Sequence, residues 1–251
     1  MAQQDFYQKP VLLDREKHRQ TRVRPIDGFG FAGKSNSLYL AGAEFNEACK
    51  EYPIVFTRTG NGKFVPVAVL GLRERENLFV DAEGRWSSRY LPGFLRRYPF
   101  VLAEVPGQTL AVCIDEAYPG LNGTEGEALF DDKGQETTFL KQTLEFLTNY
   151  QREHVRTEAF CQRLQENNLL KETGARANLN DGRTYNLNGF WVVDEKKLLE
   201  LPDAAALTMF RNGEMHLISM HLVSLSNIQR LADRLSQRPE ASAGTPASPA
   251  A

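Results

Sequence analysis

The sequence has no long apolar run. No segment approaches the roughly 18 to 20 consecutive apolar residues that cross a bilayer, and the best candidate, Met215–Leu225, is interrupted by two histidines. The first residues also lack the basic segment and apolar core of a secretory signal. We therefore expect a soluble cytoplasmic protein without a transmembrane segment.

Cysteine is scarce. The three cysteines, Cys49, Cys113 and Cys161, are odd in number, lie far apart and form no C-x-x-C pair. This spacing argues against a disulfide framework and favours free thiols in a reducing compartment. His216 and His221 lie five residues apart, so they cannot share one face of a regular helix or strand. No metal site is predicted.

Neither sign of charge is in clear excess. The 30 Lys and Arg residues nearly balance the 32 Asp and Glu residues, and the net charge is −2. Domains that bind nucleic acid usually carry a positive excess, so no nucleic-acid partner is predicted.

Catalytic and cofactor motifs are also missing. No G-x-S-x-G or H-E-x-x-H occurs, and no G-x-G-x-x-G follows a predicted strand. The segment Gly28–Ser35 satisfies the letters of a phosphate loop, G-x-x-x-x-G-K-S. However, Pro25 precedes it in place of a strand, and a strand rather than a long helix is expected after it. We interpret the match as chance and assign no catalytic residue and no cofactor.

The first half of the chain consists mainly of β-branched and aromatic runs separated by turn residues. Ile54–Arg58 and Phe64–Leu72 flank Gly60-Asn61-Gly62, which is a strong hairpin signal. A short helix is expected over Glu44–Lys50. Further strands are predicted over Ser37–Leu40, Asn77–Val80, Phe100–Glu104 and Thr109–Asp115.

The second half changes to helical periodicity. Thr137–Arg152 and Thr157–Asn168 each carry an apolar stripe, which predicts a helical hairpin. A β-hairpin follows, with Asn180-Asp181-Gly182 between Ala175–Leu179 and Thr184–Val193. Short helices are predicted over Glu195–Leu201, Ala204–Arg211 and Ile228–Leu235.

These elements predict an α+β fold. We expect a mainly antiparallel sheet, with the helical hairpin and the short C-terminal helices packed on it. Residues 1–27 are interpreted as an N-terminal arm, residues 28–238 as a single domain, and residues 239–251, rich in Pro and Ala, as a disordered tail.

Arginine and aromatic residues are concentrated in one connecting segment, Arg85–Arg97. Such residues hold carboxylates or phosphates by paired hydrogen bonds and by cation–π contact. The competing interpretation is structural, with Trp86 buried and the arginines paired to local acids. If Arg96 and Arg97 lie on a strand, only one of them faces a ligand. The candidate binding residues are Arg85, Trp86, Tyr90, Arg96, Arg97 and Asp115.

Landmarks along the chain, from about His18 to about Leu231, resemble those of the SapC-like family of bacterial proteins. They include Tyr52-Pro53-Ile54-Val55-Phe56, Gly84-Arg85-Trp86, Arg96-Arg97-Tyr98-Pro99-Phe100, Cys113-Ile114-Asp115-Glu116 and Gly189-Phe190-Trp191-Val192-Val193. The resemblance implies a link, by the family's name, to surface (S-) layers and serum resistance. It supplies no agreed catalytic residues. A peptide-transporter permease bears the same name, and the lack of membrane spans excludes it here.

Two functions remain open. The first is a non-enzymatic binding or accessory protein that takes a peptide, a protein or a small acidic ligand. The alternative is a cytosolic enzyme that acts on a small acidic or aromatic substrate through Asp115 or Glu116 with the Arg85–Arg97 segment. Location at the surface layer would require export without a signal. Whether Trp86, Arg96, Arg97 and Asp115 meet at one pocket distinguishes the two functions.

Overall fold

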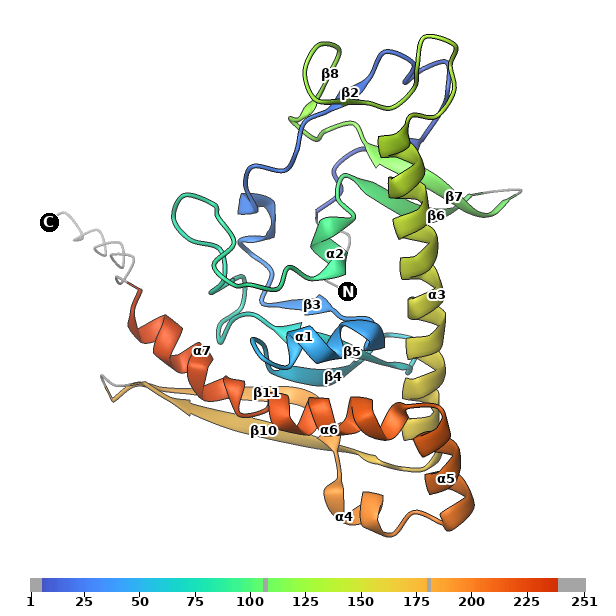
Figure 1. The fold of residues 1–251 in the computed structure, drawn as a ribbon. Coiled ribbons are helices and arrows are strands. Elements are labelled where there is room, and N and C mark those ends of the chain that lie inside the picture. Colours follow the sequence, from blue (N-terminus) through green and yellow to red (C-terminus); the bar gives the residue numbers. More distant parts are fainter. Residues whose placement is uncertain (1–5, 106–107, 180–181, 239–251) are drawn as a thin grey trace, which may run out of the picture.

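The computed structural model describes residues 6–105, 108–179 and 182–238, and these form short strands and seven α-helices (Figure 1). The strands are β1 Pro10–Leu12, β2 Arg22–Val23, β3 Ser37–Tyr39, β4 Ile54–Arg58, β5 Phe64–Val69, β6 Phe100–Val105, β7 Gln108–Asp115, β8 Leu121–Asn122, β9 Glu127–Ala128, β10 Leu170–Asn178 and β11 Thr184–Val193. The α-helices are α1 Phe45–Ala48, α2 Gly93–Arg96, α3 Thr138–Glu166, α4 Glu195–Leu199, α5 Asp203–Arg211, α6 Glu214–Ser224 and α7 Asn227–Ser236.

The strands form three antiparallel sheets. One has five strands in the order β10-β11-β4-β5-β3, and the other two have the orders β1-β7-β6 and β8-β2-β9. The β4–β5 hairpin is confirmed, with Gly62 in the left-handed region (φ +82°) at its turn. The β10–β11 hairpin joins this sheet where Trp191 pairs with Phe56. The predicted α+β class is therefore confirmed.

Some of the sequence predictions concern residues outside the described ranges. These are the turn residues Asn180-Asp181 and the tail from residue 239 onward. The segment interpreted as an arm contains β1, which pairs with β7, and β2, which pairs with β8 and β9.

The predicted helical hairpin is wrong, because α3 is one continuous helix of 29 residues. The four residues between the two stripes, 153–156, include no Gly or Pro that would end a helix. Val155 and Arg156 are exposed, and Arg156 pairs with Glu153 at 2.9 Å, whereas the His154 ring packs against Tyr39. In Figure 1, α3 runs along one side of the molecule, from the β8-β2-β9 sheet to α5 and α6.

One further prediction failed, and one helix was not predicted at all. Asn77–Val80 forms turns and a single bridge between Val80 and Trp86 rather than a strand. The Asn77 side chain accepts the Phe79 N–H (2.9 Å) and donates to the Ala32 carbonyl (3.0 Å), which replaces ladder pairing. The helix α6 was not predicted, because apolar residues surround its axis and leave no polar stripe.

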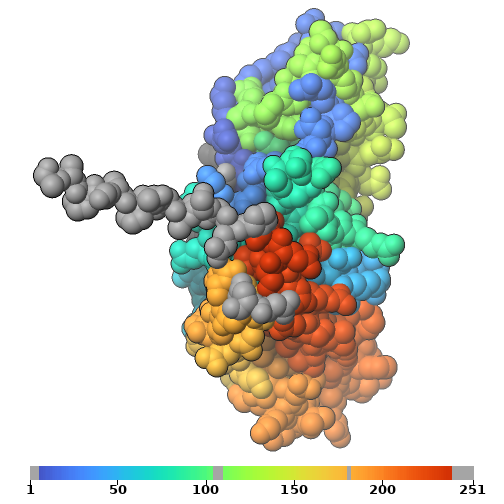
Figure 2. Space-filling view, turned by 90° about the vertical axis from the view of Figure 1, so that its left-hand side faces the viewer, coloured from blue at the N-terminus to red at the C-terminus, as the bar shows by residue number. Residues whose placement is uncertain are grey.

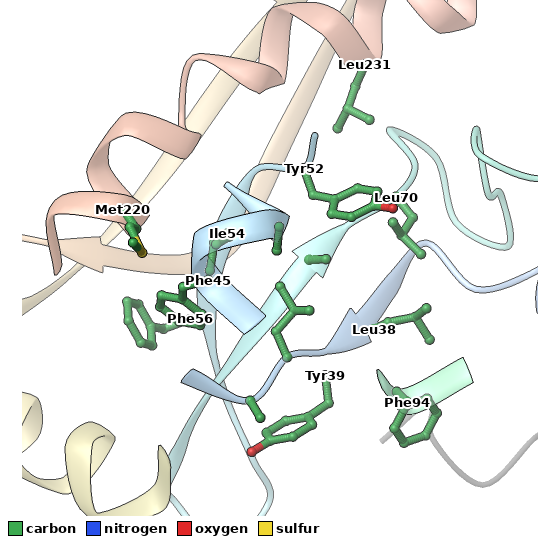
Figure 3. Packing of buried hydrophobic residues seen from close by; sticks show 14 of the residues in the cluster. Leu38, Tyr39, Phe45, Tyr52, Ile54, Phe56, Leu70, Phe94, Met220 and Leu231 are labelled. Carbon is green, nitrogen blue, oxygen red and sulfur yellow. The ribbon is translucent and has the colours of Figure 1, made fainter. Parts of the chain in front are cut away.

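The interior has two large hydrophobic clusters that share α3. The first cluster packs the five-stranded sheet against α6, α7 and α2, and Figure 3 shows Phe94 of α2 beside Leu38 and Tyr39. The second cluster lies under the other two sheets and takes Leu140 and Leu147 from the N-terminal half of α3. Farther along the helix, its C-terminal half contributes to the first cluster. The helix therefore connects both parts of the core.

Candidate binding site

A cavity of about 500 Å³ lies beside α2, between the end of β2 and the N-terminal half of α3. Most of its lining is apolar, including Ile26, Phe29 and Leu91. Its polar lining residues are Arg24, Arg96, Arg97, Glu127, Gln142 and Thr143. An apolar cavity with a few convergent polar groups is the usual form of a ligand site.

Arg96 ends α2 and extends into solvent above two aromatic rings. Its Cζ lies 5.2 Å from the Phe146 ring centre and 5.9 Å from that of Tyr90. The one hydrogen bond of its side chain within the described chain, to the Tyr90 hydroxyl, is long at 3.5 Å. The guanidinium is therefore positioned by its aromatic neighbours rather than by an acid.

Arg97 follows directly and is more deeply placed. Its Cζ lies 4.0 Å from the Phe94 ring centre, 5.5 Å from that of Tyr150 and 5.8 Å from that of Tyr7. Its Nε is buried and has no hydrogen-bond partner among the described residues. Stacking uses the faces of a guanidinium and leaves its N–H edge available. A buried donor without an acceptor costs about 1–3 kcal/mol.

Within the described parts of the chain, neither Arg96 nor Arg97 forms an ion pair with a carboxylate. The two residues lie at the end of a helix, not on a strand, and both line the cavity. The expectation that only one of them faces a ligand while the other pairs with an acid does not apply to this geometry.

A buried carboxylate, Glu44, holds the segment that carries both arginines. Its Oε1 accepts the Gly93 N–H (2.6 Å) and the Tyr90 hydroxyl (2.8 Å), and its Oε2 accepts the Ala41 N–H (2.9 Å). Burial and the nearby Glu44 raise the pKa of Tyr90, so its hydroxyl remains a donor. Gly93 is required here, since an added Cβ would lie 2.8 Å from the Tyr150 ring. No pattern in the sequence indicates this role of Glu44.

Arg85 and Trp86 lie outside the lining of the cavity. Arg85 is exposed and pairs with Asp81 (2.8 Å) and Glu83 (3.0 Å) in its own turn. The Trp86 indole N–H donates to the Tyr90 carbonyl (3.1 Å), and its ring stacks on Phe79. Trp86 therefore packs on the hydrophobic core and holds Tyr90, in the segment that carries Arg96 and Arg97.

Asp115 is separated from the cavity and fully buried. Its carboxylate accepts the backbone N–H groups of Gln8 (3.0 Å), Lys9 (2.8 Å) and Ala117 (3.1 Å). Two of these bonds fix Gln8 and Lys9, just before β1, against the end of β7. Its neighbour Glu116 bonds Lys17 and Lys9, which lower the pKa of Glu116 to about 2. Of the predicted site residues, the structure brings together Arg96 and Arg97, with Tyr90 beside them.

A larger cavity, of about 570 Å³, lies between α3 and the turn from α5 to α6. Its charged residues already have partners: Arg163 bonds both oxygens of the buried Glu214, and Arg156 pairs with Glu153. Arg211 also lines it, on an exposed surface. We regard the smaller cavity as the better candidate, because two of its arginines, Arg96 and Arg97, lack carboxylate partners in the described chain.

The described residues include no cluster of three or more His, Cys, Asp or Glu side chains that could hold a metal ion. They also include no helix that is long and apolar enough to cross a membrane. All three cysteines are free thiols, and burial raises the pKa of Cys161 to about 12.

Comparison with known proteins identifies the family of the chain but no individual relative. No curated protein and no solved structure shows detectable similarity to the chain. A family model described as SapC matches residues 13–231, most of the chain and all of the cavity lining. The chain therefore belongs to the SapC family.

Proposed function

We propose that this protein is a non-enzymatic binding protein whose cavity beside α2 takes a ligand with a carboxylate and an apolar body. The observation that carries the proposal is the pair Arg96 and Arg97. Both residues line one mostly apolar cavity, and neither forms an ion pair with any described carboxylate. The guanidinium of Arg96 is exposed and has no acid partner in the described chain, and a ligand carboxylate would pair with it.

The apolar lining supports a ligand that is more than a bare anion. Ile26, Phe29, Leu91 and Phe139 present hydrocarbon surface to the cavity. Covering such surface stabilises a complex by roughly 25 cal/mol per Å² of apolar area removed from water. A carboxylate joined to an aromatic or branched aliphatic body would use both kinds of contact.

Binding without catalysis is proposed because the candidate acid–base groups have structural contacts. Asp115 is buried and accepts three backbone N–H groups, and Glu116 is paired with Lys9 and Lys17. Neither residue lines the cavity beside α2.

The proposal includes a cytosolic location and an accessory role linked to the surface layer through the family's name. Its support is the set of three free thiols, two of them buried. In fractionated cells, the native protein should accompany a cytosolic marker. Recovery in the surface-layer extract, with intact-membrane controls, would place it outside the cell instead.

The test of the binding proposal is calorimetric titration with hydrocinnamate, an aromatic monocarboxylate, and with its uncharged amide. Arg96→Gln should weaken hydrocinnamate binding by about 1.5–3 kcal/mol, roughly tenfold to a hundredfold. Arg96→Lys keeps the charge but loses the planar fork, so it should also bind more weakly. Arg85→Gln is the matched control, because Arg85 is exposed and outside the cavity.

The thermal stability of the Arg96 variants should stay close to that of the wild type, because Arg96 is exposed. The proposal fails if hydrocinnamate does not bind at millimolar concentration. It also fails if the amide binds equally well, or if Arg96→Gln and Arg85→Gln have the same effect.

A further inference from the structure

The cavity beside α2 has opposite charges at its two ends. Arg96 contacts Phe146 on α3. Glu127 lies on β9, and its neighbour Ala128 accepts the hydroxyl of Thr137, the residue that caps the start of α3, at 2.6 Å. Residue Glu127 therefore lies near the N-terminal end of α3, and the guanidinium of Arg96 lies farther along the helix.

The helix gives the scale of this separation. Phe139 and Phe146 both line the cavity and are seven residues apart. At 1.5 Å per residue, they are separated by about 10 Å along the helix axis. Gln142 and Thr143 lie between them on the same face, so polar groups are placed midway along an otherwise apolar wall.

Glu127 is available to bind a ligand, because no residue of the described chain pairs with its carboxylate. It is exposed and forms no ion pair with any described residue, whereas the nearby Arg24 pairs with Glu125 at 3.7 Å. The cavity thus combines an uncompensated carboxylate at one end with uncompensated guanidinium groups at the other.

We propose that the ligand is a short apolar peptide with free termini, about three residues long. The inference rests on the proposed function and specifies its ligand. Arg96 and Arg97 would bind the C-terminal carboxylate, and Glu127 would bind the N-terminal ammonium group. An extended peptide spans roughly 3.3–3.6 Å per residue, so three residues match the spacing of about 10 Å between Phe139 and Phe146 along the cavity wall. A single amino acid is too short to reach both ends.

The middle of the cavity suits a peptide backbone. The Gln142 side-chain amide offers both a donor and an acceptor, as a peptide group requires. The ligand's side chains would then face Phe29, Leu91 and Ile26.

The test is calorimetric titration with trileucine, N-acetyl-trileucine and trileucine amide. The wild type should bind trileucine about tenfold or more tighter than either blocked peptide. In Glu127→Gln, free and acetylated trileucine should bind equally, while the preference for the free carboxylate remains. In Arg96→Gln, the preference for the free carboxylate should be lost instead. Glu145→Gln, an exposed α3 residue outside the cavity, is the control.

The outcomes separate this inference from the function on which it rests. If acetylation has no effect while amidation and Arg96→Gln weaken binding, the peptide proposal is wrong and carboxylate binding stands. The peptide proposal is likewise wrong, with carboxylate binding intact, if hydrocinnamate binds and trileucine does not. If neither amidation nor Arg96→Gln alters binding, carboxylate recognition itself is wrong.

Discussion

At the scale of single residues, buried polar side chains fix the segment that carries the arginines. Glu44 is 7% exposed and joins Ala41, Tyr90 and Gly93 through both of its oxygens. Hydrogen bonds to a charged group are stronger than neutral ones. The three bonds to Glu44 should therefore contribute measurably to the free energy of unfolding.

Replacing Glu44 with Gln should therefore lower the free energy of unfolding by about 1–3 kcal/mol, since one acceptor becomes a donor facing N–H groups. Tyr90→Phe, which removes one of the three bonds, should cost about 1 kcal/mol. Urea unfolding measures both values. A Glu44→Gln variant as stable as the wild type would show that Glu44 does not hold the segment.

His221 gives a pH dependence. It is fully buried, its Nε2 accepts the Val193 N–H (3.1 Å), and its Nδ1 lies 2.8 Å from the Ile54 carbonyl. Burial lowers the pKa of His221 from 6.5 to about 4. Between these values the unfolded chain binds a proton that the folded chain does not, so stability falls as the pH falls.

This loss should amount to about 3 kcal/mol between pH 6.5 and pH 4. The His221→Gln variant should be less stable at neutral pH and should lack this contribution. Subtracting its stability curve from that of the wild type isolates His221 from the carboxylates that also titrate. Parallel curves between pH 5 and pH 6.5 would contradict the assignment.

At the scale of elements, β4 and β11 have the predicted bounds, because β-branched runs and turn residues mark strand ends locally. The continuity of α3 and the loop at Asn77 depend on what packs around them, which local sequence patterns do not record.

The residues around the candidate site could also be predicted only in part. The density of arginine pointed to Arg96 and Arg97, whereas Glu44 and Glu127 come from distant segments and only the fold brings them near.

The continuity of α3 can be tested at Val155, where a connection between two helices was expected. Val155 is 55% exposed, so a substitution there affects mainly the backbone. Val155→Pro should destabilise the protein by about 3 kcal/mol or more, since it removes a hydrogen bond inside a helix. Val155→Ala should be close to neutral. Equal stability of the two variants would support a loop at this position.

At the scale of the whole molecule, α3 contributes to both cores, and so does the segment from α2 to β6, with Phe94 in the first cluster and Phe100 in the second. In Figure 2, the N-terminal segments and the green segments gather in the upper part, and the C-terminal helices gather in the lower part. Residues from both clusters line the cavity beside α2, such as Phe100 and Phe29. A ligand bound there should therefore stabilise both parts of the core.

A substitution in one core should accordingly be detected in the other. Leu147 belongs to the second cluster, whereas both tryptophans, Trp86 and Trp191, pack against the first. Leu147→Ala should cost about 2–5 kcal/mol and shift the unfolding midpoint measured by tryptophan fluorescence. An unchanged fluorescence midpoint, with a lower midpoint by circular dichroism, would show two independently unfolding parts.

The most direct test of the account is the NMR spectrum of the arginine Nε–H groups during titration with trileucine. Binding of the carboxylate should shift the Nε–H signal of Arg96, because a new charged acceptor reaches it, and that of Arg97, because a new charge lies nearby. The signals of Arg85 and Arg163, which already pair with acids, should stay in place. Unchanged Arg96 and Arg97 signals under conditions in which the peptide binds would contradict the account.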